Sequence, residues 1–408
     1  MTDQEPFPLV LLGAGASAPA GVPTAVEMTR RMMEACRQDA QHDYLRALSA
    51  IYGGLQMGLG QSEVPRLGCP DVEQVLNAAS LLGDRFNLEF APFVATWHPI
   101  IGELERRNFS RLDAQAVVSS AMSRLSSIGR RGTAMSETEA LSAFGAVLQE
   151  ALSKMGDHLS QYPDGALFRG LNAYLTGKLI EFTWLQSPEK LVYLDPLLAA
   201  ARHVPIAVAT LNYDNAVELR GAHLGVPCET GLSAWSATGQ LPLVATGIDL
   251  MKLHGSVRWR WSTRSAKSAI GLSHREISET NDKPKSAGFN RRYTEDEGHL
   301  LGVIFGGHNK LIADGPFLDL LAKFKDTLEK HRRLLVVGYS FRDPHVNHFI
   351  TRWLYRDASR QVTIVDQPGS PDTYSRLFEA GGYRLVERLT FDPIGAESGF
   401  AKYFSKSA

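Results

Sequence analysis

The sequence predicts an α/β protein, in which helices cover a largely parallel sheet and a large, mostly helical insertion interrupts the sheet. Three observations lead to this prediction. Short apolar segments end in glycine or a polar residue, helical patterns separate several of them, and residues 38–200 have a helical texture. Alternating strands and helices are typical of a parallel sheet whose crossovers are helical.

The expected strands are short apolar runs without helical periodicity. They lie at residues 8–12, 204–210, 248–253, 301–305, 334–337 and 362–365. Helices are expected at residues 24–36, 71–82, 136–159, 196–202, 317–328 and 344–354. The chain is therefore expected to form a sheet domain from residues 1–37 and 203–408, with residues 38–202 as a helical insertion domain.

Composition and charge exclude several classes of protein. Lys and Arg total 43 and Asp and Glu total 44, so a protein that mainly follows a phosphate backbone is disfavoured. No apolar run approaches the length of about 20 residues that a membrane span requires, and the acidic N-terminus is unlike a signal peptide. We expect a cytoplasmic protein without membrane contact.

The three cysteines exclude a four-cysteine zinc site and a disulfide framework. Cys36, Cys69 and Cys228 are too far apart in the sequence to form a C-x-x-C pair. One polar segment, residues 262–298, is expected to be a mobile loop or a loop that a partner orders. It overlaps residues 258–292, where nine Lys/Arg against three Asp/Glu give an excess of +6. This basic segment is either a solvated loop or a contact for nucleic acid or an acidic partner.

A glycine turn follows the first expected strand. Gly13, Ala14, Gly15, Ala16 and Ser17 form this turn, and Ala18 stands where the dinucleotide-binding pattern has its third glycine. Such a turn lets the backbone approach a pyrophosphate closely, and the next helix would offer its N-terminus to the phosphate charge. A structural turn without ligand remains an equal alternative.

Polar residues end the next two strands, where open α/β sheets bind their ligands. Asn212 could hold a ribose hydroxyl or a water molecule, because its amide both donates and accepts hydrogen bonds. Asp214 is interpreted mainly as a helix cap, with ligand binding as the alternative. His254 lies at a strand end before a glycine, where an imidazole can act as a general base.

A second glycine turn and an acidic residue complete the candidate set. Gly338, Tyr339 and Ser340 follow the strand at 334–337, and Asp366 ends the last strand, where an acid commonly binds ribose. Asp343 precedes Pro344 and is interpreted as the cap of a helix rather than a metal ligand.

Four segments in this order, GAGAS, TLNYD, KLHGS and VVGYSFRDPH, resemble the Sir2 superfamily, and most closely the bacterial Sir2-like domains of antiphage defence systems. The resemblance covers about the first 35 residues and then about 203–370. It implies a Rossmann-like fold that binds NAD, with Asn212 and His254 as the catalytic residues. It also implies pyrophosphate binding by the turn at 13–17, and adenosine binding at the turn formed by Gly338, Tyr339 and Ser340.

Gly21, Val22 and Pro23 resemble the family's segment near the nicotinamide end of NAD, and Thr24 follows directly. Sirtuin deacylases carry two C-x-x-C zinc pairs and an acidic-aromatic-arginine run after this segment, and this chain has neither. No metal site is therefore expected. The resemblance instead implies an NAD hydrolase that releases nicotinamide and ADP-ribose as an NAD-depleting antiviral effector. A homo-oligomer or a separate sensor or HerA-type ATPase subunit would restrain it.

Other functions stay open at this point. The first is a non-catalytic NAD or ADP-ribose sensor, which would need neither Asn212 nor His254. The second is a regulatory subunit of a nucleic-acid-acting defence complex, based on the basic segment at 258–292. No clustered acidic metal site accompanies that segment. A deacylase or ADP-ribosyltransferase is disfavoured by the missing cysteines.

Overall fold

A computed structural model describes residues 7–60, 69–85, 165–242, 244–267, 273–283, 300–304, 315–367 and 387–405, together with residues 101, 104, 119–127, 142–147 and 150. The chain forms two compact units. Unit 1 contains residues 1–31, 69–74 and 176–408, and unit 2 contains residues 32–68 and 75–175. Within the described residues, every helix is too short or too polar to span a lipid bilayer.

Unit 1 is built on a seven-stranded parallel sheet. Its strands are β1 (Leu9–Leu12), β2 (Ile206–Thr210), β3 (Cys228–Glu229), β4 (Ile248–Lys252), β8 (Arg333–Val337), β9 (Gln361–Val365) and β10 (Leu389–Asp392). They lie in the order β10-β9-β8-β1-β2-β4-β3. Without the short edge strand β3, this is the 3-2-1-4-5-6 order of dinucleotide-binding α/β sheets. The prediction of an α/β fold with a Rossmann-like parallel sheet is confirmed.

The point where the strand order reverses lies between β1 and β8. From β1 the chain builds outward through β2 and β4, and it then returns to β8 on the other side of β1. In open α/β sheets the ligand crevice forms at such a switch point, outside the carboxyl ends of the strands. Leu12 of β1 pairs with Val337 of β8 and with Thr210 of β2, so these strand ends lie at one level.

Both faces of the sheet are covered, because successive residues of a strand point to opposite sides. Leu9 and Leu11 belong to the apolar cluster that includes helices α11 (Phe317–Lys330) and α12 (Pro344–Arg356). Val10 and Leu12 belong to the cluster on the other face. That face carries η5 (Pro188–Leu194), α8 (Asp195–Ala201), α9 (Ala216–Leu224) and α14 (Ala396–Phe404).

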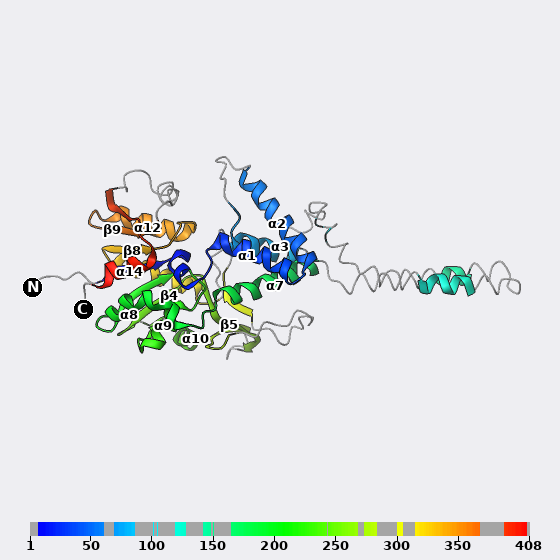
Figure 1. Ribbon diagram of the computed structural model, residues 1–408. Helices are drawn as coiled ribbons and strands as arrows, with labels where there is room; N and C mark the ends of the chain where they lie inside the picture. Colours follow the sequence, from blue (N-terminus) through cyan, green and yellow to red (C-terminus); the bar gives the residue numbers. More distant parts are fainter. Residues whose placement is uncertain are drawn as a thin grey trace, which may run out of the picture. The chain divides into compact units, whose positions relative to one another are not determined.

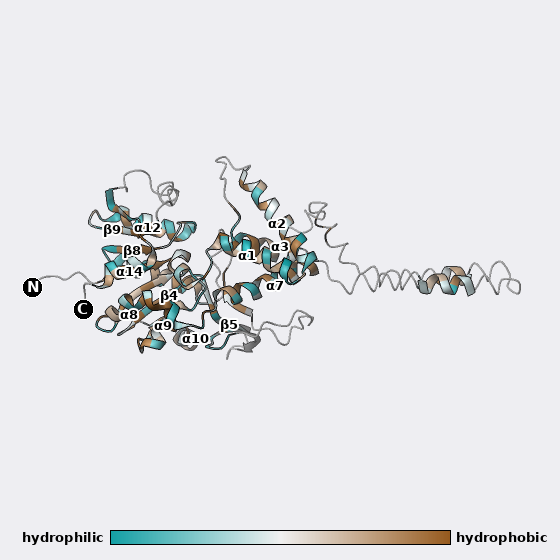
Figure 2. Cartoon of the chain, in the orientation of Figure 1, coloured by the Kyte–Doolittle hydropathy of each residue, from teal (hydrophilic) through white to brown (hydrophobic). Residues whose placement is uncertain are grey.

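Burial on both faces explains why the strands read as continuous apolar runs in the sequence. The strands around β4 are coloured mostly brown in Figure 2, as expected for a buried sheet. Helices α8 and α14 come from distant parts of the sequence and lie side by side in Figure 1.

A second, antiparallel sheet begins directly after His254. It contains β5 (Gly255–Lys267), β6 (Ser273–Glu279) and β7 (Leu300–Val303) in the order β6-β5-β7. The mobile loop predicted at 262–298 is therefore wrong for the end of β5 and for β6, while residues 284–299 lie outside the described part. Trp259 is buried against Phe317. This apolar contact orders a segment whose composition looks polar.

Two basic residues of the 258–292 segment are internal rather than solvated. The Arg258 guanidinium reaches Glu218 and Glu279, at 3.8 and 3.6 Å. Arg260 is buried and donates to the carbonyl of Trp259 at 2.6 Å. Burial lowers the pKa of Arg260 to about 10. The local excess of positive charge in the sequence therefore overstates the charge that this segment offers to a partner.

Unit 2 is helical in its described residues. It contains the second half of α1 (Ala25–Gln38), all of α2 (His42–Gly60), and parts of α3 (Val72–Asp84) and α7 (Ala166–Thr183). Tyr174 connects α7 to the end of α1, because its hydroxyl donates to Asp39 at 2.8 Å. Burial and this carboxylate raise the pKa of Tyr174. The predicted helix at 136–159 is described only at 142–147 and 150, which are helical.

Candidate functional site

Asn212 and His254 follow two neighbouring strands at the same distance from the strand ends. Thr210 of β2 pairs with Lys252 of β4, and each candidate residue comes two positions later. Neighbouring strands are about 4.8 Å apart. The strands stay connected beyond their ends, because Leu253 N–H donates to Thr210 O at 3.0 Å. The register therefore places both residues side by side at the carboxyl edge of the sheet.

The side chain of Asn212 is buried and directed at the turn after β1. Its Nδ2 donates to the carbonyl of Gly13 at 2.8 Å and to the hydroxyl of Ser17 at 3.0 Å. Because a carbonyl oxygen can only accept, the amide nitrogen must face Gly13. The amide oxygen of Asn212 therefore points away from that carbonyl, and the chemistry it can offer a ligand is that of an acceptor.

The two glycine turns contact each other through their backbones. Gly15 N–H donates to Gly338 O at 2.8 Å, and Gly13 N–H donates to Val337 O at 2.9 Å. A Cβ added to Gly13 would lie 2.5 Å from Gly338 O, and one added to Gly338 would lie 2.4 Å from Ala16 N. Gly338 also has a φ of +62°. Both turns thus need glycine in order to meet at the switch point, before any ligand is considered.

The turn at 13–17 differs from the expected phosphate-binding turn. The N–H groups of Ala16 and Ser17 donate to Gly13 O and Ala14 O, so these amides close the turn itself. Two 3-10 turns follow, η1 (Ala14–Ala16) and η2 (Ala18–Ala20), and α1 begins only at Ala25. The helix expected at residues 24–36 is present as α1, and residues 18–24 separate its start from the turn at 13–17.

The segment between the turn and α1 contains the other predicted residues of the N-terminal part. Gly21 has a φ of +89°, a conformation that favours glycine. Pro23 is buried and Thr24 is exposed. Thr24 O accepts the N–H of Met28 at 2.8 Å, which places Thr24 at the start of the helix.

His254 is buried between two carboxylates. Its Nε2 lies 2.7 Å from Asp343 Oδ2, and its Nδ1 lies 3.6 Å from Glu73 Oε1. We call His254, Asp343 and Glu73 the site cluster. Glu73 belongs to residues 69–74, which form part of unit 1 although they are distant from the sheet in sequence.

Tyr213 holds Glu73 in this cluster. Its hydroxyl donates to Glu73 Oε1 at 2.8 Å, and its ring lies 6.3 Å from the ring of His254. Burial, reinforced by the Glu73 carboxylate, raises the pKa of Tyr213 well above its usual value. Tyr213 is therefore held in its neutral form, in which its hydroxyl donates a hydrogen bond.

Asp214 has protein partners on both sides. Its Oδ1 accepts the N–H of Ala216 at 3.0 Å, near the start of α9. Burial raises the pKa of the Asp214 carboxyl, and Lys252 and the Ser17 hydroxyl offset part of that rise. These contacts agree with the capping interpretation of Asp214, although the cap position itself is Asn215.

A second group of charged side chains, two of them buried and two partly buried, lies next to Asp214. Lys252 Nζ donates to Asp214 O, and it contacts Glu218 Oε1 at 3.1 Å. Arg258 lies near Glu218 and Glu279. We call Lys252, Glu218, Arg258 and Glu279 the support cluster. Its two cations and two carboxylates balance in charge.

The residues that the sequence analysis expected near adenosine differ in exposure and in their partners. Tyr339 is buried and its hydroxyl donates to Asn347 Oδ1 at 3.0 Å, so this side chain supports the loop after β8. Ser340 is exposed. Asp366 follows β9, and its Oδ1 accepts Gln367 N–H at 2.8 Å. Burial raises the pKa of the Asp366 carboxyl.

The structure adds two residues that the sequence analysis did not place in the site. Asp343 caps α12 as predicted, because its Oδ1 accepts the N–H groups of His345 and Val346. Its other oxygen, however, contacts His254, which the capping pattern could not reveal. No pattern in the sequence indicated Glu73 as a site residue, apart from its place in a helix. Its contact with His254 joins positions that are 181 residues apart in the sequence.

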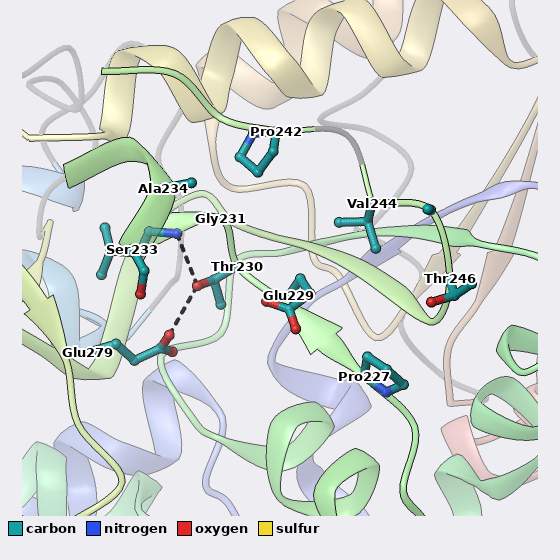
Figure 3. Close-up of a pocket in the computed structure, with 12 residues that line it drawn as sticks. Pro227, Glu229, Thr230, Gly231, Ser233, Ala234, Pro242, Val244, Thr246 and Glu279 are labelled. Carbon is teal, nitrogen blue, oxygen red and sulfur yellow. Dashed lines mark hydrogen bonds between the residues drawn. The ribbon is translucent and has the colours of Figure 1, made fainter. Parts of the chain in front are cut away.

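A separate cavity of about 470 Å³ lies beside β3 and α10 (Leu232–Thr238), and Figure 3 shows its lining. Thr230 donates to Glu279 at 3.2 Å on its wall. None of the sequence-predicted site residues lines this cavity. The cavity borders the support cluster at Glu279. No residue of the site cluster lines it.

Comparison with known families finds one family model that matches part of the sheet domain. Residues 206–386 match the SIR2-like domain. The matched residues begin with β2 and include Asn212, His254, Gly338 and Asp343, while β1 and the turn at 13–17 precede them. No curated protein is significantly similar in sequence to the whole chain.

Solved structures of Sir2 homologues are similar at a low level. A Sir2 homologue solved as its NAD complex is 13% identical, with 99% of this chain and 90% of that chain covered and a TM-score of 0.39. A mutant Sir2 homologue solved with ADP-ribose is 12% identical, covers 99% of this chain and 92% of that chain, and has a TM-score of 0.38. These values are too low to place ligand contacts on this chain.

Among the residues that the structure describes, no three side chains of His, Cys, Asp or Glu converge to hold a metal ion. The site cluster joins its two carboxylates to opposite nitrogens of one imidazole ring instead. Such an arrangement controls where a proton resides on the ring, which is the chemistry of a general base.

Proposed function

We propose that this protein hydrolyses NAD at the bond between nicotinamide and ribose C1′, and that Asn212 and His254 carry the reaction. One observation supports the proposal: Asn212 and His254 each lie two residues beyond a paired position of β2 and β4, at the carboxyl edge of a 3-2-1-4-5-6 sheet. Sheets of this order bind dinucleotides at that edge. The match to the SIR2-like domain supports the same assignment.

Asn212 would orient the attacking water or a ribose hydroxyl. Its amide nitrogen is held by Gly13 and Ser17, which fixes the direction of the amide oxygen. An oxygen held in this way can accept a hydrogen bond from the water and place it for attack on C1′. A nucleophile positioned in advance removes part of the entropic cost of the reaction.

His254 would accept the proton that the water loses, directly or through a ribose hydroxyl. The bond from the water oxygen to C1′ forms, the bond from C1′ to the pyridinium nitrogen breaks, and its electron pair leaves with neutral nicotinamide. The transition state resembles an oxocarbenium ion, as in other glycosidic cleavages. The products are nicotinamide, ADP-ribose and a proton.

The remaining predicted residues would bind the other parts of NAD. Ala14 and Gly15 are half-buried at the switch point, beside Gly338, and would border the diphosphate. Pro23 and Thr24 would lie toward nicotinamide. Tyr339, Ser340 and Asp366 would lie toward adenosine. Asp214 would act on the site through Ser17 rather than by contact with NAD.

The resemblance to antiphage Sir2-like domains suggests a cellular role for this hydrolysis. An enzyme that depletes NAD would stop growth of an infected cell, and it needs a resting state in which turnover is low. We propose that assembly into a homo-oligomer, or a separate sensor or HerA-type ATPase subunit, supplies this control. A size measurement with and without NAD, alongside the product assay, tests the first of these routes.

The decisive experiment compares wild type with Asn212→Ala and His254→Ala. Loss of acid–base help or of water positioning should lower nicotinamide release by about 10²–10⁴-fold. Nicotinamide and ADP-ribose are quantified by chromatography, and NAD binding by calorimetry. His223→Ala is the matched control, because His223 is exposed in the last turn of α9.

The outcomes separate the alternatives. Equal turnover in wild type and in both site variants removes Asn212 and His254 from the mechanism. NAD binding by wild type without any product supports the non-catalytic sensor instead.

A further inference from the structure

The two carboxylate oxygens of Asp343 have different partners: one caps helix α12, and the other contacts His254, the candidate base. Its Oδ1 accepts the N–H groups of His345 and Val346 at 2.9 and 3.2 Å, and its Oδ2 lies 2.7 Å from His254 Nε2. We propose that Asp343 is a positioning residue that keeps the proton of neutral His254 on Nε2. The lone pair then stands on Nδ1, the nitrogen that accepts a proton. This inference rests on the hydrolysis proposed above.

The chemistry of the two partners sets the direction of the hydrogen bond. Asp343 lies at the N-terminus of a 13-residue helix, where two backbone N–H groups and the helix dipole favour its ionised form. An ionised carboxylate only accepts hydrogen bonds. The nitrogen that faces it must therefore be the donor. A neutral imidazole has one donor and one acceptor nitrogen, so a donor at Nε2 defines Nδ1 as the acceptor.

The loop that carries Asp343 is held in one conformation. Phe341 is buried and has a φ of +51°, which is rare for a bulky residue. Asn347 of α12 donates to Phe341 O at 2.7 Å. Tyr339 donates to Asn347 Oδ1 and accepts the N–H of Asp343 at 3.1 Å. These contacts keep a locally unfavourable backbone in place, as is common where a side chain must be aimed.

Glu73 completes the surroundings of the ring. Its Oε1 lies 3.6 Å from Nδ1 and is held by the hydroxyl of Tyr213. When His254 takes up a proton, the imidazolium ion lies between two carboxylates, Asp343 and Glu73. Opposite charges at this range favour the charged form of the ring. Glu73 would thus stabilise the protonated state, while Asp343 would set the orientation and the tautomer of the neutral state.

The test exchanges the acceptor at Nε2 for a donor. In Asp343→Asn, the amide can present its NH₂ group to Nε2, which would move the ring proton to Nδ1. Asparagine still caps helices well, and so does the serine of a second variant, Asp343→Ser. Both should fold with little change in thermal midpoint. We expect kcat for nicotinamide release to fall by about 10²–10⁴-fold, with the Kd for NAD within about threefold of wild type.

A matched control makes the same substitution at the other end of the same helix. Asp357 is the exposed C-cap residue of α12, where its Oδ1 accepts the N–H of Ser359 at 2.8 Å. Asp357→Asn should leave kcat within about twofold. A loss of kcat in Asp357→Asn equal to that in Asp343→Asn would overturn the proposal, since the effect would then belong to the helix.

Ring-nitrogen spectroscopy tests the tautomer without relying on turnover. In protein labelled with ¹⁵N-histidine, the His254 signals are assigned by their loss in His254→Gln. We expect protonated Nε2 and unprotonated Nδ1 in neutral His254 of wild type, and the reverse in Asp343→Asn. An unchanged tautomer in Asp343→Asn overturns the proposal. If wild type releases no nicotinamide, the proposed function fails, and the ring signals still decide the role of Asp343.

Discussion

Two groups of buried charged side chains form at the end of the same strand, and they differ in charge balance. Lys252, the last residue of β4, joins the support cluster, in which two cations face two carboxylates. His254, two positions later, joins the site cluster, in which two carboxylates face one imidazole. The charges of the support cluster cancel one another. The net charge of the site cluster changes when the imidazole ring gains a proton.

This difference separates support from chemistry. A buried ion pair gives little net stability compared with apolar packing, but removal of one partner is costly because the other charge stays buried. The support cluster therefore behaves as a unit that fixes β4, α9 and β5 relative to one another. An imidazole that is not locked in an ion pair of this kind can instead exchange protons with a bound molecule. The three predictions that follow test this division, from the largest expected effect to the smallest.

Replacement of Lys252 by methionine should strongly destabilise the protein. Glu218 would lose its nearest cation while remaining buried, which is expected to lower the free energy of unfolding by about 3–5 kcal/mol. Urea denaturation followed by tryptophan fluorescence measures this loss. At a temperature where the variant is folded, its kcat should stay within about tenfold of wild type, in contrast to the Asp343 variants.

The double variant Lys252→Met/Glu218→Leu is the control for this prediction. It leaves Arg258 opposite Glu279 and removes the unpaired charge, so most of the lost stability should return. Equal destabilisation in the single and double variants would show that packing, rather than charge balance, holds the support cluster.

Replacement of Gly338 by alanine tests the turn that leads to Asp343. The left-handed backbone should cost about 1–2 kcal/mol, and the close approach to the turn at 13–17 should cost about 1–3 kcal/mol more. Gly239→Ala is the matched control, because Gly239 has a φ of +72° but no atom within 4 Å of an added Cβ. Thermal denaturation of both variants separates strain from contact. Equal losses would mean that the two turns do not need their close contact.

The pH dependence of stability should reveal the buried carboxyl of the support cluster. Burial raises the pKa of Glu279 above its ordinary value of 4.5. Above pH 4.5 the folded chain then holds a proton that the unfolded chain has released. Stability should therefore fall as pH rises through this window, by up to about 1.4 kcal/mol per pH unit. Urea denaturation between pH 4 and 7 should show a shallower slope in Glu279→Gln than in wild type.

Glu329 on the surface should affect the pH dependence of stability in the opposite direction. Burial opposes the shift, but the Arg360 and Arg356 guanidinium groups outweigh it and hold the pKa of Glu329 below 4.5. Its contribution to stability should be present above pH 4.5 and decline as pH falls, with a small size because the pair is largely exposed. If Glu279→Gln and Glu329→Gln changed the pH dependence of stability in the same direction, burial would not be what shifts the pKa of Glu279.

Much of the fold was predictable from local pattern. The strands of the parallel sheet are buried on both faces, so their apolar runs stand out in the sequence, and the helices at 317–330 and 344–356 have clear apolar periodicity. The strand expected at 301–305 is present as β7, but it lies in the antiparallel sheet. Strands β5 and β6 of that sheet were missed, because they carry charged and polar residues. Trp259 and Ile277 bury enough apolar surface to order them, which composition could not show.

The sequence by itself determined which strands end in polar residues and where the two glycine turns lie. It also indicated Asn212 and His254 as candidate site residues and Asp343 as a helix cap. Local signals suffice for these, because strand periodicity, capping and turn chemistry act between near neighbours. Only the tertiary structure decided that the glycine turns fit against each other, that Asp343 serves His254 as well as its helix, and that Glu73 joins them. Those contacts depend on the sheet register and on crossover connections, which bring distant residues together without leaving a pattern in the sequence.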